Sequence, residues 1–162
     1  MARIGETSSE SLRSMSDIVW AIDPENDQGE ALVKRMRRIA HELLESKGVA
    51  VEMNLTGSVE ELRLPMNARK DLLLIFKEAA HNASKYAQAR SVTVELVRAN
   101  GALTMSVKDD GKGFDPTLHP DGHGLGSMHR RAASLGAILQ LQSAPGHGTL
   151  VGVEVDLTRI RD

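Results

Sequence analysis

The chain has 162 residues, with 20 basic and 22 acidic side chains, one tryptophan, one tyrosine, two phenylalanines and no cysteine. The length suits one domain burying roughly 70% of its unfolded surface, while balanced charge and few aromatic residues exclude a typical nucleic-acid-binding surface. Because the chain has no cysteine, disulfides and thiolate metal sites are also excluded. No run approaches the roughly 20 apolar residues of a membrane span, and both observations favour a cytoplasmic domain.

Hydrophobic periodicity predicts three helices and one strand in the first half of the chain. Apolar residues at helical spacing indicate helices over residues 8–22, 29–46 and 67–87. Asn67 follows Pro65 and is the expected N-cap of the third helix. Between the second and third helices, residues 49–55 alternate and predict a strand.

A hairpin and a long loop follow the third helix. Residues 91–98 and 102–108 alternate between apolar and polar side chains on either side of Asn100-Gly101. An Asn-Gly pair between two such runs is the strongest short-range signal for a β-hairpin. Residues 109–124 are rich in glycine and contain two prolines, which predicts a loop.

The last part of the chain predicts a helix over residues 125–135 and a pair of strands over 138–142 and 149–157. Strands that pair mostly with sequence neighbours imply an α+β fold. It would be a two-layer α/β sandwich in which a mixed, mostly antiparallel sheet carries its helices on one face. We expect residues 27–162 to form this domain and residues 1–26 to lie outside it, as a stalk or a partner-binding element.

The third predicted helix carries the sequence FKEAAHNASKYA, in which Glu78, Asn82 and Lys85 share one face. Such a face is most often simply solvated. However, Leu74 and Ile75 lie on the same side one turn earlier, and asparagine is a poor choice for an exposed helix interior. The alternative is a site for a magnesium-phosphate group, because Mg²⁺ takes one or two protein oxygens together with phosphate oxygens and water.

A second candidate site is VKDDGKGFD, at the end of a predicted strand. Asp-Asp-Gly is also common in simple polar turns. In the functional interpretation, Asp109 is a buried acceptor for an amino group on a flat ring. Adenine carries an amine at its six position, where guanine carries an oxygen. Gly111 and Gly113 let the chain turn and let another group approach the backbone closely.

A third candidate is GHGLGSMHRR, where glycines lead into a helix start whose free N–H groups suit an anion. Its spacing fits neither the dinucleotide fingerprint nor the phosphate-loop pattern. His119, His123 and His129 have no carboxylate or cysteine at a recognisable metal-ligand spacing. Near the end of the chain, APGHGT is either a plain hairpin turn or a turn that places Thr149 next to the ligand.

Together and in this order, three motifs resemble the ATP-binding boxes of one superfamily. EAAHN is similar to the N box, DDGKGF to the first glycine box and GHGLGSM to the second. The superfamily includes gyrase, heat-shock chaperones, mismatch-repair MutL and histidine kinases. Two further stretches, SLRSMSDIVWAIDP and SAPGHGTLVGVEV, resemble sensor histidine kinases specifically. The resemblance implies the Bergerat-type ATP-binding fold.

The resemblance also implies residue roles, with ATP and Mg²⁺ as cofactors. Asn82 would hold Mg²⁺, Lys85 the phosphates and Asp109 the adenine amine, while Glu78 would position or activate the attacking group. The run from Lys112 to Gly124 would close as a lid. The remaining nucleotide-binding positions implied by the boxes are Tyr86, Gly111, Gly113, Phe114, Gly122, Gly124, Leu125, Gly126 and Thr149.

The resemblance therefore implies the ATP-binding catalytic region of a two-component sensor histidine kinase, with residues 1–26 as the end of its dimerisation helix and a linker. It would transfer the γ-phosphoryl group of ATP to a histidine on a dimerisation domain, for relay to a response regulator. We expect it in the cytoplasm, alone or as the cytosolic part of a membrane-bound sensor, without contact to nucleic acid or membrane. Two alternatives are an anti-sigma-factor serine kinase of the same superfamily and a nucleotide-binding switch module without catalysis.

His41 is a tempting acceptor, because RRIAHELLES places a histidine before an acid on a predicted helix. Two dimerisation helices of about 30 Å need about 40 residues. Only 36 residues, positions 42–77, separate His41 from Glu78, and they must also contain a strand and part of another helix. We therefore expect His41 to be a partly exposed structural residue and the acceptor to lie upstream of Met1, outside this chain.

Overall fold

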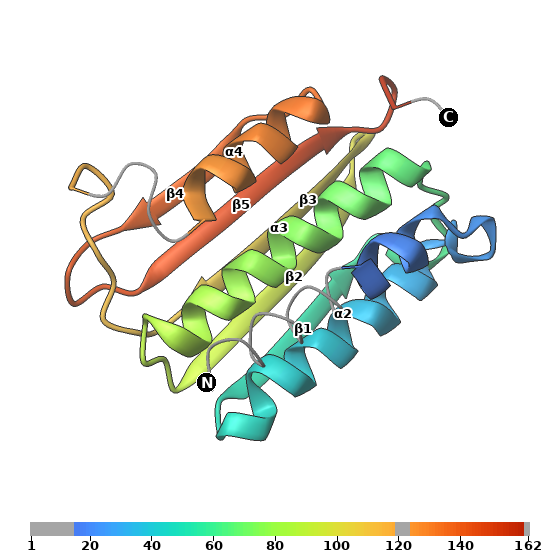
Figure 1. The fold of residues 1–162 in the computed structure, drawn as a ribbon. Helices are drawn as coiled ribbons and strands as arrows, with labels where there is room; N and C mark the ends of the chain where they lie inside the picture. The colour runs from blue at the N-terminus through green and yellow to red at the C-terminus, as the bar shows by residue number, and fades with distance from the viewer. Residues whose placement is uncertain (1–14, 119–123, 161–162) are drawn as a thin grey trace.

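The computed structural model describes residues 15–118 and 124–160, which form one sheet covered on one face by helices (Figure 1). The strands are β1 (Ala50–Thr56), β2 (Ser91–Ala99), β3 (Ala102–Asp109), β4 (Leu139–Ser143) and β5 (Thr149–Asp156). The helices are α2 (Gly29–Leu43), α3 (Met66–Lys85) and α4 (Leu125–Ser134). In Figure 1, α3 lies between α2 and α4, all in front of the sheet. The predicted two-layer fold is confirmed.

The sheet has the strand order β1-β2-β3-β5-β4 and is mixed, as predicted. β1 and β2 run parallel, because α3 returns the chain between them, and the other neighbouring strands are antiparallel. β2 and β3 form the predicted hairpin, and Asn100 and Gly101 both have positive φ angles of 53° and 75°. This conformation matches the turn that Asn-Gly pairs favour between strands.

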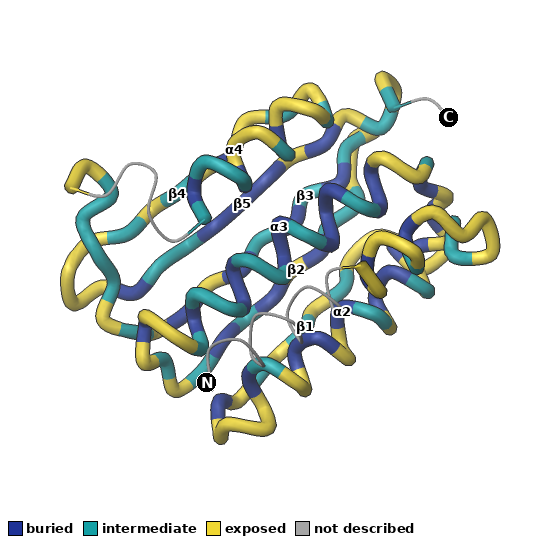
Figure 2. Tube along the Cα trace, viewed as in Figure 1, coloured by how far each residue is buried: buried dark blue, intermediate teal, exposed yellow. Residues whose placement is uncertain are grey.

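The core lies between the sheet and the helices. Buried side chains alternate with more exposed ones along β2 and β3, because successive side chains of a strand point to opposite faces. Figure 2 shows α3 largely buried over the middle of the sheet, whereas α2 and α4 expose their outer faces. The buried residues of β2, β3 and α3 include Val92, Val94, Leu96, Leu103, Met105, Val107, Leu72, Leu73, Phe76, Ala79, Ala80 and Ala83. This packing holds α3 in place along its length.

The predicted N-cap of α3 was wrong. Pro65, with an extended conformation, is the N-cap residue, and Asn67 lies inside the first turn. The helix begins early because the Pro65 carbonyl already accepts the Arg69 N–H at 3.0 Å. Proline suits a helix boundary, since it has no N–H to leave without a partner. The second helix also ended earlier than predicted, at Leu43, and a short 3-10 turn follows it before Gly48.

Residues 15–22 are helical and pack on α2 and α3; the part of the predicted helix before residue 15 lies outside the described residues. Asp17 is buried, and its carboxylate pairs with Arg35 of α2 at 2.8 Å and with Lys77 of α3 at 2.6 Å. The buried guanidinium of Arg69 donates to the Ala21 carbonyl at 2.6 Å from Nη2. Ion pairs and hydrogen bonds thus join the N-terminal segment to the domain. The division at residue 26 stays a prediction.

The opposite side of residues 15–22 is apolar and exposed, through Met15, Ile18, Val19 and Ile22. Among the helices in the described ranges, none combines the length and the apolar character needed to cross a membrane.

Candidate functional site

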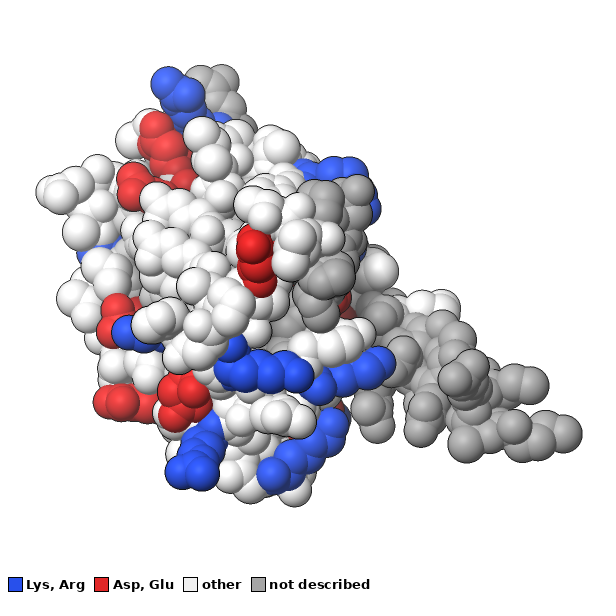
Figure 3. Space-filling model, turned by 90° about the vertical axis from the view of Figure 1, so that its left-hand side faces the viewer, with Lys and Arg blue, Asp and Glu red and all other residues white. Residues whose placement is uncertain are grey.

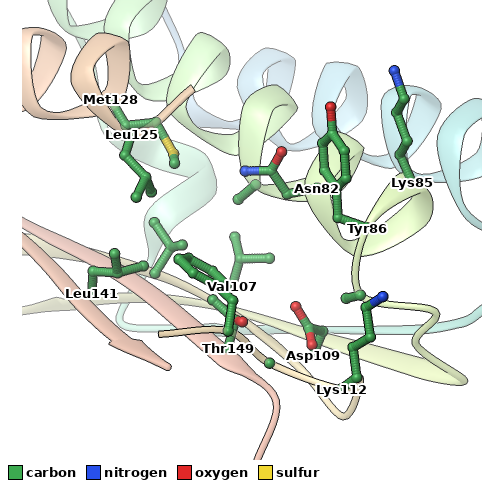
Figure 4. Close-up of a pocket in the computed structure, with 15 residues that line it drawn as sticks. Asn82, Lys85, Tyr86, Val107, Asp109, Lys112, Leu125, Met128, Leu141 and Thr149 are labelled. Atoms are coloured by element: carbon green, nitrogen blue, oxygen red, sulfur yellow. The ribbon is translucent and has the colours of Figure 1, made fainter. Parts of the chain in front are cut away.

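A pocket of about 250 Å³ lies between the helices and the sheet, at the C-terminal end of α3. Figure 4 shows α3 and α4 on one side of it and strands of the sheet on the other. The lining includes, among the residues predicted from the sequence, Asn82, Lys85, Tyr86, Asp109, Gly113, Phe114, Leu125 and Thr149. The fold therefore gathers side chains that are up to 67 positions apart in the chain, from Asn82 to Thr149.

Asp109 is the most buried charged group of the pocket, with 7% of its surface exposed. It ends β3 and lies directly opposite Thr149 of β5 (Figure 4). Burial raises the pKa of Asp109 above 3.8, against hydrogen bonds from the backbone N–H groups of Gly111 and Thr149, while the charge of Asp110 raises it further. Such a carboxylate gains most from a ligand that brings a hydrogen-bond donor, since burial has removed its water.

The neighbouring Asp110 has a different role. It is exposed, and its carboxylate accepts the backbone N–H groups of Arg90 and Ser91 at 2.8 and 2.9 Å. These hydrogen bonds lower the pKa of Asp110. Asp110 therefore fixes the chain that leads into β2, while Asp109 faces the pocket.

Gly111 and Gly113 are needed because the protein's own backbone approaches them. A Cβ atom on Gly111 would meet the Ala87 carbonyl oxygen, and one on Gly113 would meet the Ala144 carbonyl oxygen. Gly113 also has a φ of +64°, which disfavours other residues. The close approach expected from the sequence is present, and the approaching groups are the segments after α3 and after β4.

The polar face of α3 becomes more exposed toward the C-terminal end of the helix, where its residues line the pocket. Asn82 is half-buried in the lining, and Lys85 and Tyr86 follow it where the helix ends. The ammonium of Lys85 lies 5.4 Å from the centre of the Tyr86 ring. An amide and a cation therefore stand at the pocket's edge, where they could reach a charged group of a ligand (Figure 4).

The other predicted residues lie beside the pocket rather than in its lining. Glu78 stands one turn before Asn82 and contacts the start of α4: a Cβ atom on Gly124 would meet its carboxylate. Gly126 belongs to the first turn of α4. Gly122 lies outside the described residues, as do residues 119–121 and 123 of the predicted lid.

Reasoning from the motifs missed the apolar walls of the pocket. Val107 lies two residues before Asp109, and Val151 two residues after Thr149, so strand alternation could have identified both. Met128 follows Leu125 by almost one helical turn. The missed apolar lining residues are Ala79, Ala87, Val107, Met128, Leu141 and Val151, and the pocket is also lined by Lys112, which was predicted only as the start of the lid. These side chains make the pocket suitable for a flat apolar ring.

A divalent cation in this pocket would have few protein ligands. Within residues 15–118 and 124–160, no three His, Asp or Glu side chains gather into a metal-binding cluster. Asn82 offers one amide oxygen, so the donor set fits a cation that takes its other ligands from phosphate and water. Figure 3 shows the end of the molecule where loops flank the pocket: basic and acidic side chains both occur there.

Two kinds of sequence comparison match the chain. Residues 67–159 match the family described as histidine kinase-, DNA gyrase B-, and HSP90-like ATPase. The chain is 31% identical over 125 residues to the signal transduction histidine-protein kinase/phosphatase UhpB of Salmonella typhimurium, covering 76% of this chain and 24% of that protein. It is 32% identical over 114 residues to the sensor protein VraS of Staphylococcus haemolyticus, covering 69% and 32%. The chain thus spans a quarter to a third of these relatives.

Solved structures share the fold. The histidine kinase domain of the Erythrobacter litoralis blue-light activated histidine kinase superposes with a TM-score of 0.67 at 24% identity, over 95% of this chain and 84% of that chain. The histidine kinase AdeS of Acinetobacter baumannii also gives a TM-score of 0.67, at 15% identity, over 95% and 80%.

Proposed function

Because the chain belongs to the histidine kinase-, DNA gyrase B- and HSP90-like ATPase family, we propose that its pocket binds Mg-ATP for phosphoryl transfer to a histidine. The whole protein would be a sensor histidine kinase, like the relatives UhpB and VraS. The acceptor histidine would belong to a dimerisation domain outside this chain, and a response regulator would receive the phosphoryl group. The observation that carries the proposal is the buried Asp109 carboxylate between apolar walls.

Asp109 would select the base. Adenine offers it the hydrogens of an amine, whereas guanine would bring an oxygen against the carboxylate. A buried acceptor left without its donor costs about 1–3 kcal/mol. The apolar walls from Val107, Leu125 and Met128 would cover the two faces of the ring.

The polar end of α3 would hold the triphosphate. Asn82 would give its amide oxygen to Mg²⁺, and Lys85 would offset phosphate charge. The bound ion would neutralise charge that develops on the transferred group. Glu78 would orient the attacking imidazole, from its position one turn before Asn82. The chain would thus act by positioning and by charge neutralisation, without a covalent intermediate.

The relatives favour this function over the two alternatives. Those compared above are named as a histidine kinase/phosphatase and a sensor protein, rather than as anti-sigma factors. A switch module without catalysis would bind ATP and transfer nothing. Incubation of the chain with labelled ATP and the separate dimerisation domain distinguishes these functions, since only a histidine kinase yields acid-labile phosphate on that domain.

We expect ATP and ADP to bind with Mg²⁺ at least tenfold more tightly than GTP and GDP. A tenfold difference corresponds to about 1.4 kcal/mol, within the cost of an unsatisfied buried acceptor. Titration calorimetry of the chain with each nucleotide measures this ratio. Equal affinities for ATP and GTP would contradict the role of Asp109.

We also expect that the chain alone does not phosphorylate itself. His41 lies on α2 with its side chain 72% exposed and its Nδ1 atom 3.9 Å from Glu45, and α2 packs beside α3 as part of the core. Within residues 15–118 and 124–160, His41 thus belongs to the helix layer of the domain and not to a dimerisation hairpin that would present an acceptor. Phosphate mapping under conditions that preserve phosphohistidine tests this, and stoichiometric labelling of His41 would contradict it.

A further inference from the structure

Ser143, the last residue of β4, contacts three residues at or beside the pocket through one hydroxyl. Its oxygen accepts the backbone N–H of Phe114 at 2.9 Å. It also lies 3.1 Å from the Gly148 carbonyl oxygen and 2.8 Å from the hydroxyl oxygen of Thr149. Phe114 and Thr149 both line the pocket, and Ser143 stands behind them.

The chemistry of a hydroxyl fixes the direction of these hydrogen bonds. A serine hydroxyl has one hydrogen to donate and two lone pairs that accept. The Gly148 carbonyl can only accept, so the Ser143 hydrogen goes to it when all three contacts are hydrogen bonds. The Thr149 hydroxyl must then donate to Ser143. Its hydrogen is used there, and only its lone pairs remain to face a ligand.

With this direction, the Thr149 hydroxyl and the Asp109 carboxylate both face the pocket as hydrogen-bond acceptors. Thr149 pairs directly with Asp109 across β3 and β5, and Figure 4 shows the two side chains next to each other at the pocket. An ionised carboxylate also only accepts. A ligand edge that brings donors, directly or through water, matches both groups, whereas an edge that brings an oxygen is opposed by both.

The same hydroxyl belongs to a wider contact between two loops. The Gly146 N–H donates to the Lys112 carbonyl at 2.6 Å, and Gly113 packs against the Ala144 carbonyl. The turn between β4 and β5 therefore holds the loop that follows Asp109. Ser143 is the side chain that connects this contact to the pocket.

We propose that Ser143 is a positioning residue that sets base specificity, by holding the Thr149 hydroxyl as a hydrogen-bond acceptor beside Asp109. This inference rests on the proposed nucleotide site. Without Ser143, the Thr149 hydroxyl is free to rotate and to donate to the oxygen of guanine. Loss of the serine therefore weakens ATP binding and also improves GTP binding. A gain of GTP affinity separates this role from simple loss of structure.

The test is titration calorimetry of the chain with Mg-ATP and with Mg-GTP. Ser143→Ala is expected to weaken ATP binding about threefold to tenfold and to strengthen GTP binding about threefold. Ser143→Thr keeps the hydroxyl and is expected to keep the wild-type ratio. Gln142→Ala, an exposed neighbour in β4, is the matched control and should leave both affinities unchanged.

A double-mutant cycle shows whether Ser143 acts through Thr149. Thr149→Val removes the hydroxyl and should lower the preference for ATP without improving GTP binding. In the Thr149→Val background, Ser143→Ala should no longer increase the affinity for GTP. If Ser143→Ala does not fold, Thr149→Val still tests the proposal, because an unchanged ATP-to-GTP ratio in that variant overturns it.

Other results would also overturn the inference. If Ser143→Ala weakens ATP and GTP binding equally, Ser143 is merely structural. If neither affinity changes in that variant, Ser143 has no role in base specificity. By contrast, a wild-type chain that binds neither nucleotide would refute the proposed function itself.

Discussion

Replacement of Asp109 by asparagine is expected to abolish most of the affinity for ATP. The variant loses a charge-assisted hydrogen bond to the adenine amine, worth about 1.5–3 kcal/mol, and turns an amide N–H₂ group toward another donor. We therefore expect binding to weaken by about 30-fold to 300-fold, or about 2–3.5 kcal/mol. Titration calorimetry with Mg-ATP measures the loss.

Stability measurements show whether Asp109→Asn remains folded. Burial raises the pKa of Asp109 in the folded protein above the ordinary value of 3.8. The protonated side chain therefore stabilises the fold fully below pH 3.8, and this contribution is lost as the pH rises through the folded-state pKa. At neutral pH the ionised carboxylate thus opposes folding, and its neutral replacement should unfold at an equal or higher urea concentration. Asp110→Asn is the matched control and should change ATP affinity by less than about threefold, since Asp110 contacts backbone outside the pocket.

The affinity for ATP should also fall in mild acid. Adenine binding requires the ionised form of Asp109. The affinity for ATP is therefore present above the pKa that Asp109 has in the nucleotide-free protein, and it is lost as the pH falls through that pKa. Since that pKa lies above 3.8, the loss begins at a higher pH than for an ordinary aspartate. The Asp109→Asn variant provides the baseline, because titration of the nucleotide itself affects both proteins. Parallel pH profiles for the two proteins would contradict the assignment.

Asp17→Ala is expected to release the N-terminal helical segment from the domain at a cost of about 2–3 kcal/mol. Removing one member of a buried ion pair costs about 3–5 kcal/mol. The figure is lower here because the side chains of Arg35 and Lys77 are 14% and 22% exposed and keep some water. Urea unfolding measures the loss of stability, and hydrogen exchange should become faster over residues 15–22.

The control for Asp17→Ala is Glu42→Ala. Glu42 pairs with Arg38 on the surface of α2, and both side chains are largely exposed. Surface pairs of this kind contribute about 0.3–0.5 kcal/mol. Similar losses in the two variants would show that the charges at Asp17 do not hold the segment.

The sequence predicted the elements whose signals are local. The Asn100-Gly101 turn and the alternation beside it specified the hairpin, and the stretches FKEAAHNASKYA, VKDDGKGFD and APGHGT contain the polar residues that line the pocket. Helix ends were predicted less well, because the N-cap of α3 is Pro65, two residues before the expected cap at Asn67. Periodicity identifies which face of an element is apolar, and so it could not distinguish pocket walls from ordinary core.

Contacts between distant residues were the part that the sequence did not reveal. Ser143 bonds to Phe114 across 29 positions, and Lys77 bonds to Asp17 across 60. Nothing near Ser143 distinguishes it from any serine that ends a strand. Its role depends on β5 lying between β3 and β4, and that strand order is a property of the assembled sheet.

Arg69 connects the N-terminal helical segment to α3 by hydrogen bonds. Its buried guanidinium holds the carbonyl groups of Ala21 and Leu64, which mark the end of the first helical segment and the approach to α3. Arg69 and Asn82 are 13 residues apart on the same helix, a distance of about 20 Å along a stiff rod. A force applied to residues 15–22 would therefore reach α3, which carries Asn82 and Lys85 to the edge of the pocket, and it would reach α2 through Arg35.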